Sequence, residues 1–133
     1  MGLDTFASRS PADFHTEGAG PWEPELTEED LRAFKEAGLN LCGGMYSGDG
    51  SDGSFRGKVY VDIIDHITGE YLSQEWIPAD TVRQMSEALQ ACDPKRTIEE
   101  YEGYEDCTVA ELIDLQRFFR ICADRGLGLI GWS

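Results

Sequence analysis

The sequence predicts an α+β domain: a mixed, mainly antiparallel sheet of about four strands with two or three helices packed mostly on one face. Helix-capping residues precede segments in which apolar residues recur at helical spacing. The residues from Lys58 to Asp65 are instead rich in β-branched and aromatic side chains, as strands are. The chain of 133 residues is 41% hydrophobic, which is enough for a single core.

Residues 1–25 are predicted to form an irregular N-terminal arm, and residues 26–133 a single α+β domain. The arm contains several prolines and glycines, and its apolar residues recur with neither helical nor strand spacing. Its aromatic residues are Phe6, Phe14 and Trp22. A disordered tail usually has fewer, so we expect part of the arm to lie against the domain or against a partner.

The first helix is predicted from about residue 28 to 37. The Thr27 hydroxyl can cap the free backbone N–H groups at its start, and Asp30 completes a motif that resembles a capping box. Gly38 stands where a left-handed residue ends many helices. Local signals therefore define both ends of this helix.

A strand is predicted over residues 39–46, where apolar side chains alternate with others. Gly43 and Gly44 weaken this strand or mark a bulge in it. The next segment, from Ser47 to Ser54, consists mostly of glycine and aspartate. Regular structure is costly in backbone entropy there, so we expect a loop.

A β-hairpin is the main tertiary contact that we expect. Lys58 to Asp65 is its first strand, placed centrally in the sheet because its side chains are β-branched or aromatic at most positions. His66 to Gly69 turns the chain, with Gly69 supplying a positive φ. Glu70 to Trp76 then returns as the second strand.

Two further helices and a short strand complete the predicted domain. A helix from about residue 79 to 91 follows a proline and has apolar residues at helical spacing. Thr108 and Glu111 form a capping box at the start of the last helix, which Gly126 ends and which we expect to be central. Leu127 to Trp132 is the final strand.

Acidic residues outnumber basic residues by 26 to 11, which gives a net charge of −15. This charge argues against direct binding of nucleic acid and favours a protein partner with a basic surface. No apolar run approaches the roughly 20 residues that cross a membrane, and no export or lipid-anchor signal follows Met1. We therefore expect a cytoplasmic protein that does not bind membranes.

The cysteines are spaced too widely to suggest a metal site. They are Cys42, Cys92, Cys107 and Cys122. None forms a CxxC pair, and no histidine stands at zinc-finger spacing from them. Cys92 and Cys122 fall on predicted apolar helix faces, so we expect them to be reduced and buried, in keeping with a reducing cytoplasm.

The loop from Gly48 to Gly53 suggests calcium binding, but its spacing argues against it. If Gly53 is aligned with the invariant glycine of an EF-hand loop, Val59 takes the position of the essential acidic ligand. The loop also lacks the lysine of a phosphate-binding loop. We expect neither a metal nor a cofactor, and interpret the loop as a flexible connection.

Nucleophilic catalysis is not favoured by the sequence. A cysteine or serine nucleophile needs a base nearby, and the histidines are His15 in the predicted arm and His66 in the predicted hairpin turn. Paired carboxylates could serve as acid and base, but their abundance makes any chosen pair uninformative. A non-enzymatic function is therefore favoured, with no catalytic residue assigned.

An acidic segment with tyrosines is the best candidate for a functional site. The predicted partner-binding residues are Glu99, Glu100, Tyr101, Glu102, Tyr104, Glu105 and Asp106, with Asp49 and Asp52 as a second patch. Aromatic residues are enriched at the centres of protein interfaces, and spaced carboxylates can imitate the phosphates that a basic groove receives. The alternative is a solvated linker or short helix whose tyrosines pack on the core.

We therefore expect a small acidic protein-binding domain that inhibits or antagonises a basic nucleic-acid-processing protein. Toxin-neutralising immunity proteins and anti-defence proteins of phages are of this size and charge. A first alternative is a structural or assembly protein that forms a homo-oligomer through its N-terminal arm. A second is a small hydrolase that uses a carboxylate pair.

Overall fold

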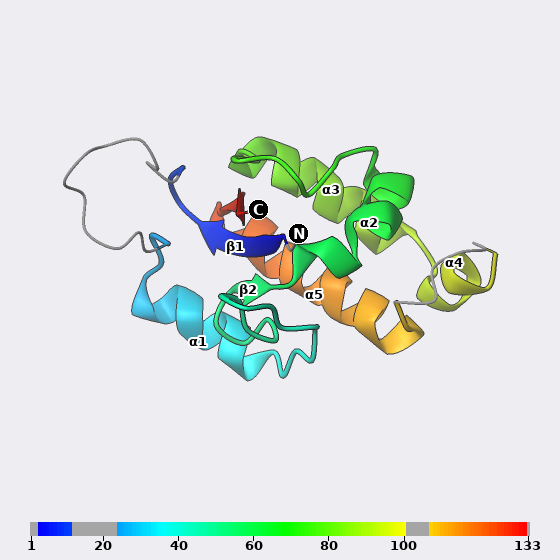
Figure 1. Cartoon of the computed structure of the whole chain (residues 1–133), viewed down its shortest axis with the longest axis horizontal. Helices are drawn as coiled ribbons and strands as arrows, with labels where there is room; N and C mark the ends of the chain where they lie inside the picture. Colours follow the sequence, from blue (N-terminus) through cyan, green and yellow to red (C-terminus); the bar gives the residue numbers. More distant parts are fainter. Residues whose placement is uncertain (1–2, 12–23, 101–106, 133) are drawn as a thin grey trace.

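The computed structural model describes residues 3–11, 24–100 and 107–132, which form a small sheet and a set of helices (Figure 1). The strands are β1 (Asp4–Ser8), β2 (Ser54–Phe55) and β3 (Gly128–Trp132). The helices are α1 (Glu28–Glu36), the 3-10 helix η1 (Gly57–Val59), α2 (Val61–Thr68), α3 (Ala79–Ala91), α4 (Pro94–Glu100) and α5 (Val109–Arg125). The α+β class is confirmed. None of the helices in these ranges has the length and apolar character needed to cross a membrane.

The sheet is antiparallel, with its three strands in the order β2-β1-β3. β1 is central, pairing Thr5 with Phe55 on one side and Phe6 with Ile130 on the other. The prediction of an irregular arm over residues 1–25 is therefore wrong for residues 4–8. Both partners of β1 are distant in the sequence, so no local turn signal marks this strand.

The predicted β-hairpin is also wrong, because Lys58 to Asp65 lies in η1 and α2. Tyr60, Ile63 and Ile64 are all buried, and their spacing puts them on one face of a helix. Gly69 does adopt a positive φ of 77°, but it ends α2 as a C-cap. Here packing of the helix against the core outweighs the strand preference of β-branched residues.

Two other predicted strands have no regular structure. Residues 39–46 bury Leu39 and Leu41 but form a loop, as the paired glycines allow. Residues 70–76 run along the outer edge of β3, where Gln74 accepts a hydrogen bond from the Gly131 N–H at 3.0 Å. The sheet of the described residues therefore has three strands where about four were predicted.

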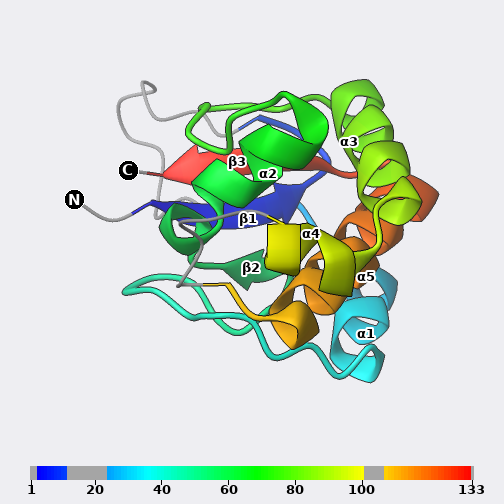
Figure 2. The same ribbon diagram turned by 90° about the vertical axis from the view of Figure 1, so that its right-hand side faces the viewer.

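Helix α5 occupies the centre of the core, as predicted. α1 lies on one side of it and α3 on the other (Figure 2). Phe118 of α5 contacts Phe34 of α1 and Phe55 of β2, each at 4.9 Å between ring centroids. The predicted bounds of α1, α3 and α5 agree with the structure within a residue or two. Helix α4 was not expected at 94–100; its Pro94 suits the first turn of a helix, where no N–H is needed.

A buried ionic cluster joins the end of β1 and the end of α5 to α1. The Asp30 side chain is fully buried and forms ion pairs with Arg9 at 2.8 Å and Arg125 at 2.5 Å. Arg9 directly follows β1, and Arg125 is the last residue of α5. Burial by itself would raise the pKa of Asp30, but hydrogen bonds from the Thr27 backbone, both arginines and the Thr27 hydroxyl lower it to about 2.

Candidate partner-binding surface

The structure describes only one end of the predicted acidic segment. Glu99 and Glu100 are exposed at the end of α4, and Glu100 pairs with Arg96 at 2.8 Å. The remaining predicted residues of this segment lie outside the described residues; they are Tyr101, Glu102, Tyr104, Glu105 and Asp106. Glu99 and Glu100 are thus surface carboxylates, as an interface would require.

Asp49 and Asp52 are exposed, but both also shape their own loop. Asp49 accepts hydrogen bonds from the Ser51 hydroxyl at 2.5 Å and the Ser51 N–H at 3.1 Å. These bonds hold the pKa of Asp49 below its ordinary value, so it is charged at neutral pH. Asp52 accepts in the same way from the hydroxyl and N–H of Ser54.

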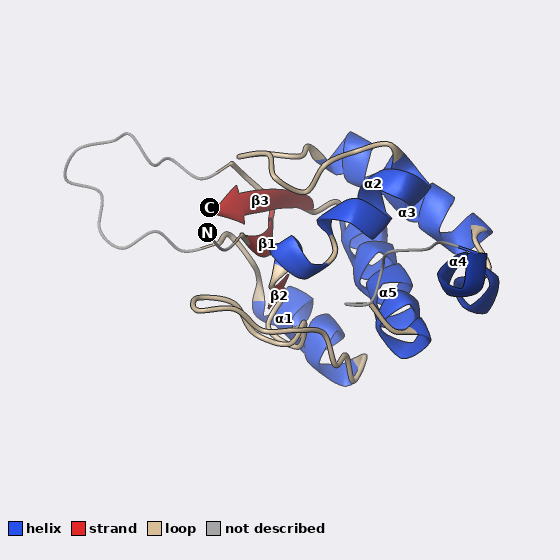
Figure 3. Ribbon diagram, turned by 45° about the vertical axis from the view of Figure 1, so that its right-hand side comes forward, coloured by secondary structure: helices blue, strands red, loops and turns tan. Residues whose placement is uncertain are grey.

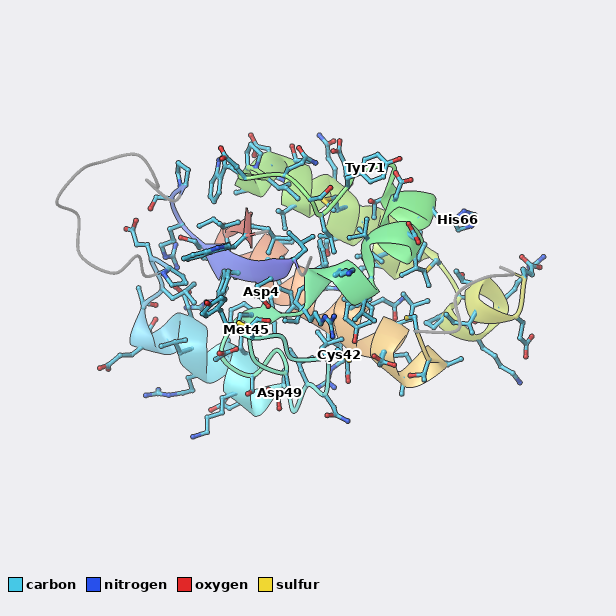
Figure 4. The ribbon with its side chains drawn as sticks, viewed as in Figure 1. Asp4, Cys42, Met45, Asp49, His66 and Tyr71 are labelled. Carbon is cyan, nitrogen blue, oxygen red and sulfur yellow. The ribbon has the colours of Figure 1, made fainter. Side chains whose placement is uncertain are left out.

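The two predicted patches are not brought together. Asp49 lies on the long loop before β2, whereas α4 with Glu99 and Glu100 lies at the far end of the molecule (Figures 1 and 4). Figure 3 shows the same separation, with the long loop beside α1 and α4 beyond α5. Any partner that touches both patches would have to span most of the domain.

Arginine side chains are mostly paired with carboxylates of the same chain. Those in ion pairs are Arg9, Arg83, Arg96, Arg117, Arg120 and Arg125. Several are neighbours three or four residues apart on a helix, such as Arg83 with Asp80 and Arg120 with Asp124. Because the chain has 26 acidic and only 11 basic residues, this pairing leaves many surface carboxylates uncompensated.

The loop between α1 and β2 is fixed to the core at Cys42. The Cys42 N–H donates to the Tyr60 hydroxyl oxygen at 2.9 Å, and its carbonyl accepts from the Arg56 N–H at 2.7 Å. The buried Tyr60 in turn donates to the Glu111 carboxylate at the start of α5. Burial and the Glu111 carboxylate raise the pKa of Tyr60 well above its usual value, so the phenol stays a donor.

A second contact fixes the middle of this loop to the sheet. The Ser47 hydroxyl donates to the Asp4 carboxylate of β1 at 2.5 Å, and the Gly44 N–H donates to the Ser47 hydroxyl oxygen at 3.0 Å. A Cβ at Gly44 would lie 2.0 Å from Asp4 Oδ1, so only glycine fits here without a shift. The Gly44–Ser47 turn is therefore held in place from both sides.

This turn presents apolar side chains to solvent. Met45 is 86% exposed and Tyr46 65% exposed, and the Tyr46 ring stacks on Trp132 of β3 at 5.8 Å between centroids. We call Met45, Tyr46 and Trp132 the Met45–Trp132 patch. The sequence analysis missed it by assigning residues 39–46 to a strand. The signal was present, since Met45 and Tyr46 lie between glycine-containing dipeptides that favour a loop.

Among the described residues, Cys42 and His66 do not form a nucleophile–base pair (Figure 4). His66 lies on the outside of α2, well away from the exposed Cys42 (Figure 4). Burial raises the pKa of the Cys107 thiol to about 12 and raises that of the fully buried Cys122 as well. Cys92, expected to be buried, is only partly so. Within residues 3–11, 24–100 and 107–132, no group of three or more His, Cys, Asp or Glu side chains is arranged to hold a metal ion.

Comparison of the chain with protein-family models, with curated proteins and with solved structures found no match. Function is therefore inferred from the contacts, exposure and charge of this chain.

Proposed function

We propose that this protein is a small non-enzymatic binding domain that recognises a basic protein surface, as an inhibitor or antagonist of a nucleic-acid-processing protein. The observation that supports this most is the internal pairing of the arginines, which leaves the excess of carboxylates facing solvent. A surface with this charge attracts basic proteins and repels nucleic acid.

The energetics support a role for this charge in association more than in folding. Exposed ion pairs such as Arg96–Glu100 contribute only about 0–1 kcal/mol to stability, so folding gives little reason for the charge excess. Complementary charge does accelerate encounter between proteins and disfavours wrong partners. Carboxylates at the surface can also occupy a groove built for phosphates, which is why a nucleic-acid-processing partner is proposed.

Self-association through the N-terminal arm is less well supported. Residues 4–8 of that arm pair with β2 and β3 of the same chain, so they are not available to a neighbouring subunit. A net charge of −15 also opposes contact between identical copies. Nothing in the described residues favours the hydrolase with a carboxylate pair.

The proposal is tested by affinity capture with matched baits. One bait is the native chain, and the other carries Asp49→Asn, Asp52→Asn, Glu99→Gln and Glu100→Gln. The new amides remove charge, and the amide oxygens at positions 49 and 52 can still accept the hydrogen bonds from Ser51 and Ser54. The loop should therefore keep its structure in the variant.

We expect the native bait to retain a basic protein that the variant bait retains at least tenfold less. The captured protein is then purified, and its activity on nucleic acid is measured with and without this chain. Loss of that activity on addition of the native chain is expected. Equal capture by both baits, or a captured protein that is acidic, would contradict the proposal.

A further inference from the structure

We propose that the Met45–Trp132 patch is the apolar anchor of this interface and receives an arginine side chain of the basic partner. This inference rests on the proposed function and names the part of the surface, and the chemical group, that give it specificity. The observation behind it is the exposure of Met45 and Tyr46 on a turn that is held by buried groups.

The exposure of Met45 and Tyr46 contrasts with the burial of most large apolar side chains in the described part of the chain. Met45 is 86% exposed, whereas Met85 in the core is 1% exposed. Scattered apolar residues at a surface need no explanation, but Met45 is next in sequence to Tyr46, which stacks on Trp132. Tyr, Trp and Met are also enriched in the centres of protein interfaces.

The turn that carries the patch is already ordered before any partner binds. Asp4, which is only 7% exposed, accepts a hydrogen bond from the Ser47 hydroxyl, and Gly44 allows the close approach of the two segments. The Cys42 backbone is bound on both sides by Tyr60 and Arg56. A fixed turn loses little conformational entropy on binding, which favours affinity.

The charge around the patch identifies the side chain that it suits. Between Lys35 and Arg56 the chain has no lysine or arginine, and the exposed Asp49 lies on the same loop as Tyr46. A guanidinium is planar, carries positive charge and stacks on aromatic faces. On a loop that carries an exposed carboxylate and no cation, the stacked Tyr46–Trp132 pair therefore fits arginine better than lysine or an apolar side chain.

The test follows the methionine methyl groups by NMR in protein labelled with [methyl-¹³C]methionine. The probe is a synthetic ten-residue peptide of alternating arginine and glycine at low salt. The control peptide has citrulline, which has the shape of arginine without its charge, and a third peptide has lysine. Met85 serves as an internal control because it is buried in the core.

We expect the arginine peptide to shift the Met45 methyl signal in a saturable way and to leave Met85 unchanged. The citrulline peptide should give no shift, and the lysine peptide should bind more weakly. Tyr46→Ala should weaken binding of the arginine peptide about threefold to fivefold. The matched control is Tyr71→Ala, because Tyr71 is similarly exposed at 54% but lies well away from Met45 (Figure 4).

The outcomes of the titration distinguish failure of the anchor proposal from failure of the proposed function. If the arginine peptide binds but the Met45 signal stays fixed, or Tyr71→Ala weakens binding as much as Tyr46→Ala, the anchor is elsewhere and the proposed function survives. If no basic peptide binds at low salt, both proposals are wrong. The Met45 titration of the native chain decides the matter even if the Tyr46→Ala variant does not fold.

Discussion

Replacement of Asp30 by asparagine should destabilise the fold more than removal of any surface charge. The Asp30 carboxylate is fully buried, and its oxygens accept from Arg125 Nε at 2.5 Å, Arg9 Nη2 at 2.8 Å and the Thr27 N–H at 2.9 Å. Asparagine keeps an oxygen for the helix cap but has no charge to offer the arginines. The cluster joins β1, α1 and α5, so its loss affects the whole core.

The expected size of the effect comes from the buried charges. Removing one partner of a buried ion pair typically costs about 3–5 kcal/mol, and we expect about 3 kcal/mol because Arg9 is partly exposed. The pKa of Asp30, lowered from 3.8 to about 2, independently gives ~2 kcal/mol at neutral pH. Because the folded pKa is lowered, this contribution is present above pH 3.8 and is lost as the pH falls toward 2; about half remains at pH 3.

The assay is urea unfolding followed by circular dichroism at pH 7 and at pH 3. The free energy of unfolding of Asp30→Asn should be lower than that of the native chain by about 3 kcal/mol at pH 7, with a smaller difference at pH 3. Glu100→Gln, which removes the exposed partner of Arg96, should change it by less than about 1 kcal/mol. A difference below 1 kcal/mol for Asp30→Asn, or one that grows toward pH 3, would refute the account of this cluster.

Two substitutions and one labelling experiment test the anchoring of the loop and the burial of the cysteines. Gly44→Ala should lower the melting temperature and cost about 1–3 kcal/mol, because the new Cβ would lie 2.0 Å from Asp4 Oδ1. Tyr60→Phe should cost about 1–3 kcal/mol by urea unfolding, since it leaves the Cys42 N–H and the Glu111 carboxylate without the hydroxyl that lies between them. A change within about 0.3 kcal/mol would show that water replaces the hydroxyl. Native alkylation followed by mass spectrometry should label the exposed Cys42 and spare the buried Cys107 until the chain unfolds.

Elements with local sequence signals could be predicted, including the capped helices α1 and α5, helix α3 after Pro78 and the final strand β3, whereas β1, α2 and α4 could not. Thr27 and Thr108 each form the predicted capping box in the structure, and the helices that they begin were predicted with nearly correct bounds. β1 has no such signal, because both of its partner strands come from distant parts of the chain. α2 was mistaken for a strand because it is rich in β-branched residues, as a buried strand is.

The candidate surface, too, could be predicted only in part. The exposure of Asp49 and Asp52 follows from a glycine-rich loop and was expected. The exposure of Met45 and Tyr46 was not, because it depends on the contact between Ser47 and Asp4, which are 43 residues apart in the sequence. The pairing of Arg9 and Arg125 with Asp30 likewise depends on the fold, because these residues are 21 and 95 positions from Asp30 in the sequence. The other paired arginines make local contacts three or four residues apart on a helix.

The most direct test of the proposed function is the association rate constant of the chain with the basic protein that it captures, measured by stopped flow at 50 and 500 mM NaCl. Steering by the excess carboxylates predicts that the rate constant falls about tenfold or more at the higher salt concentration, because added salt shortens the range of the charge interaction. The dissociation rate should change much less. An association rate that is the same at both salt concentrations would contradict the claim that the acidic surface recruits the partner.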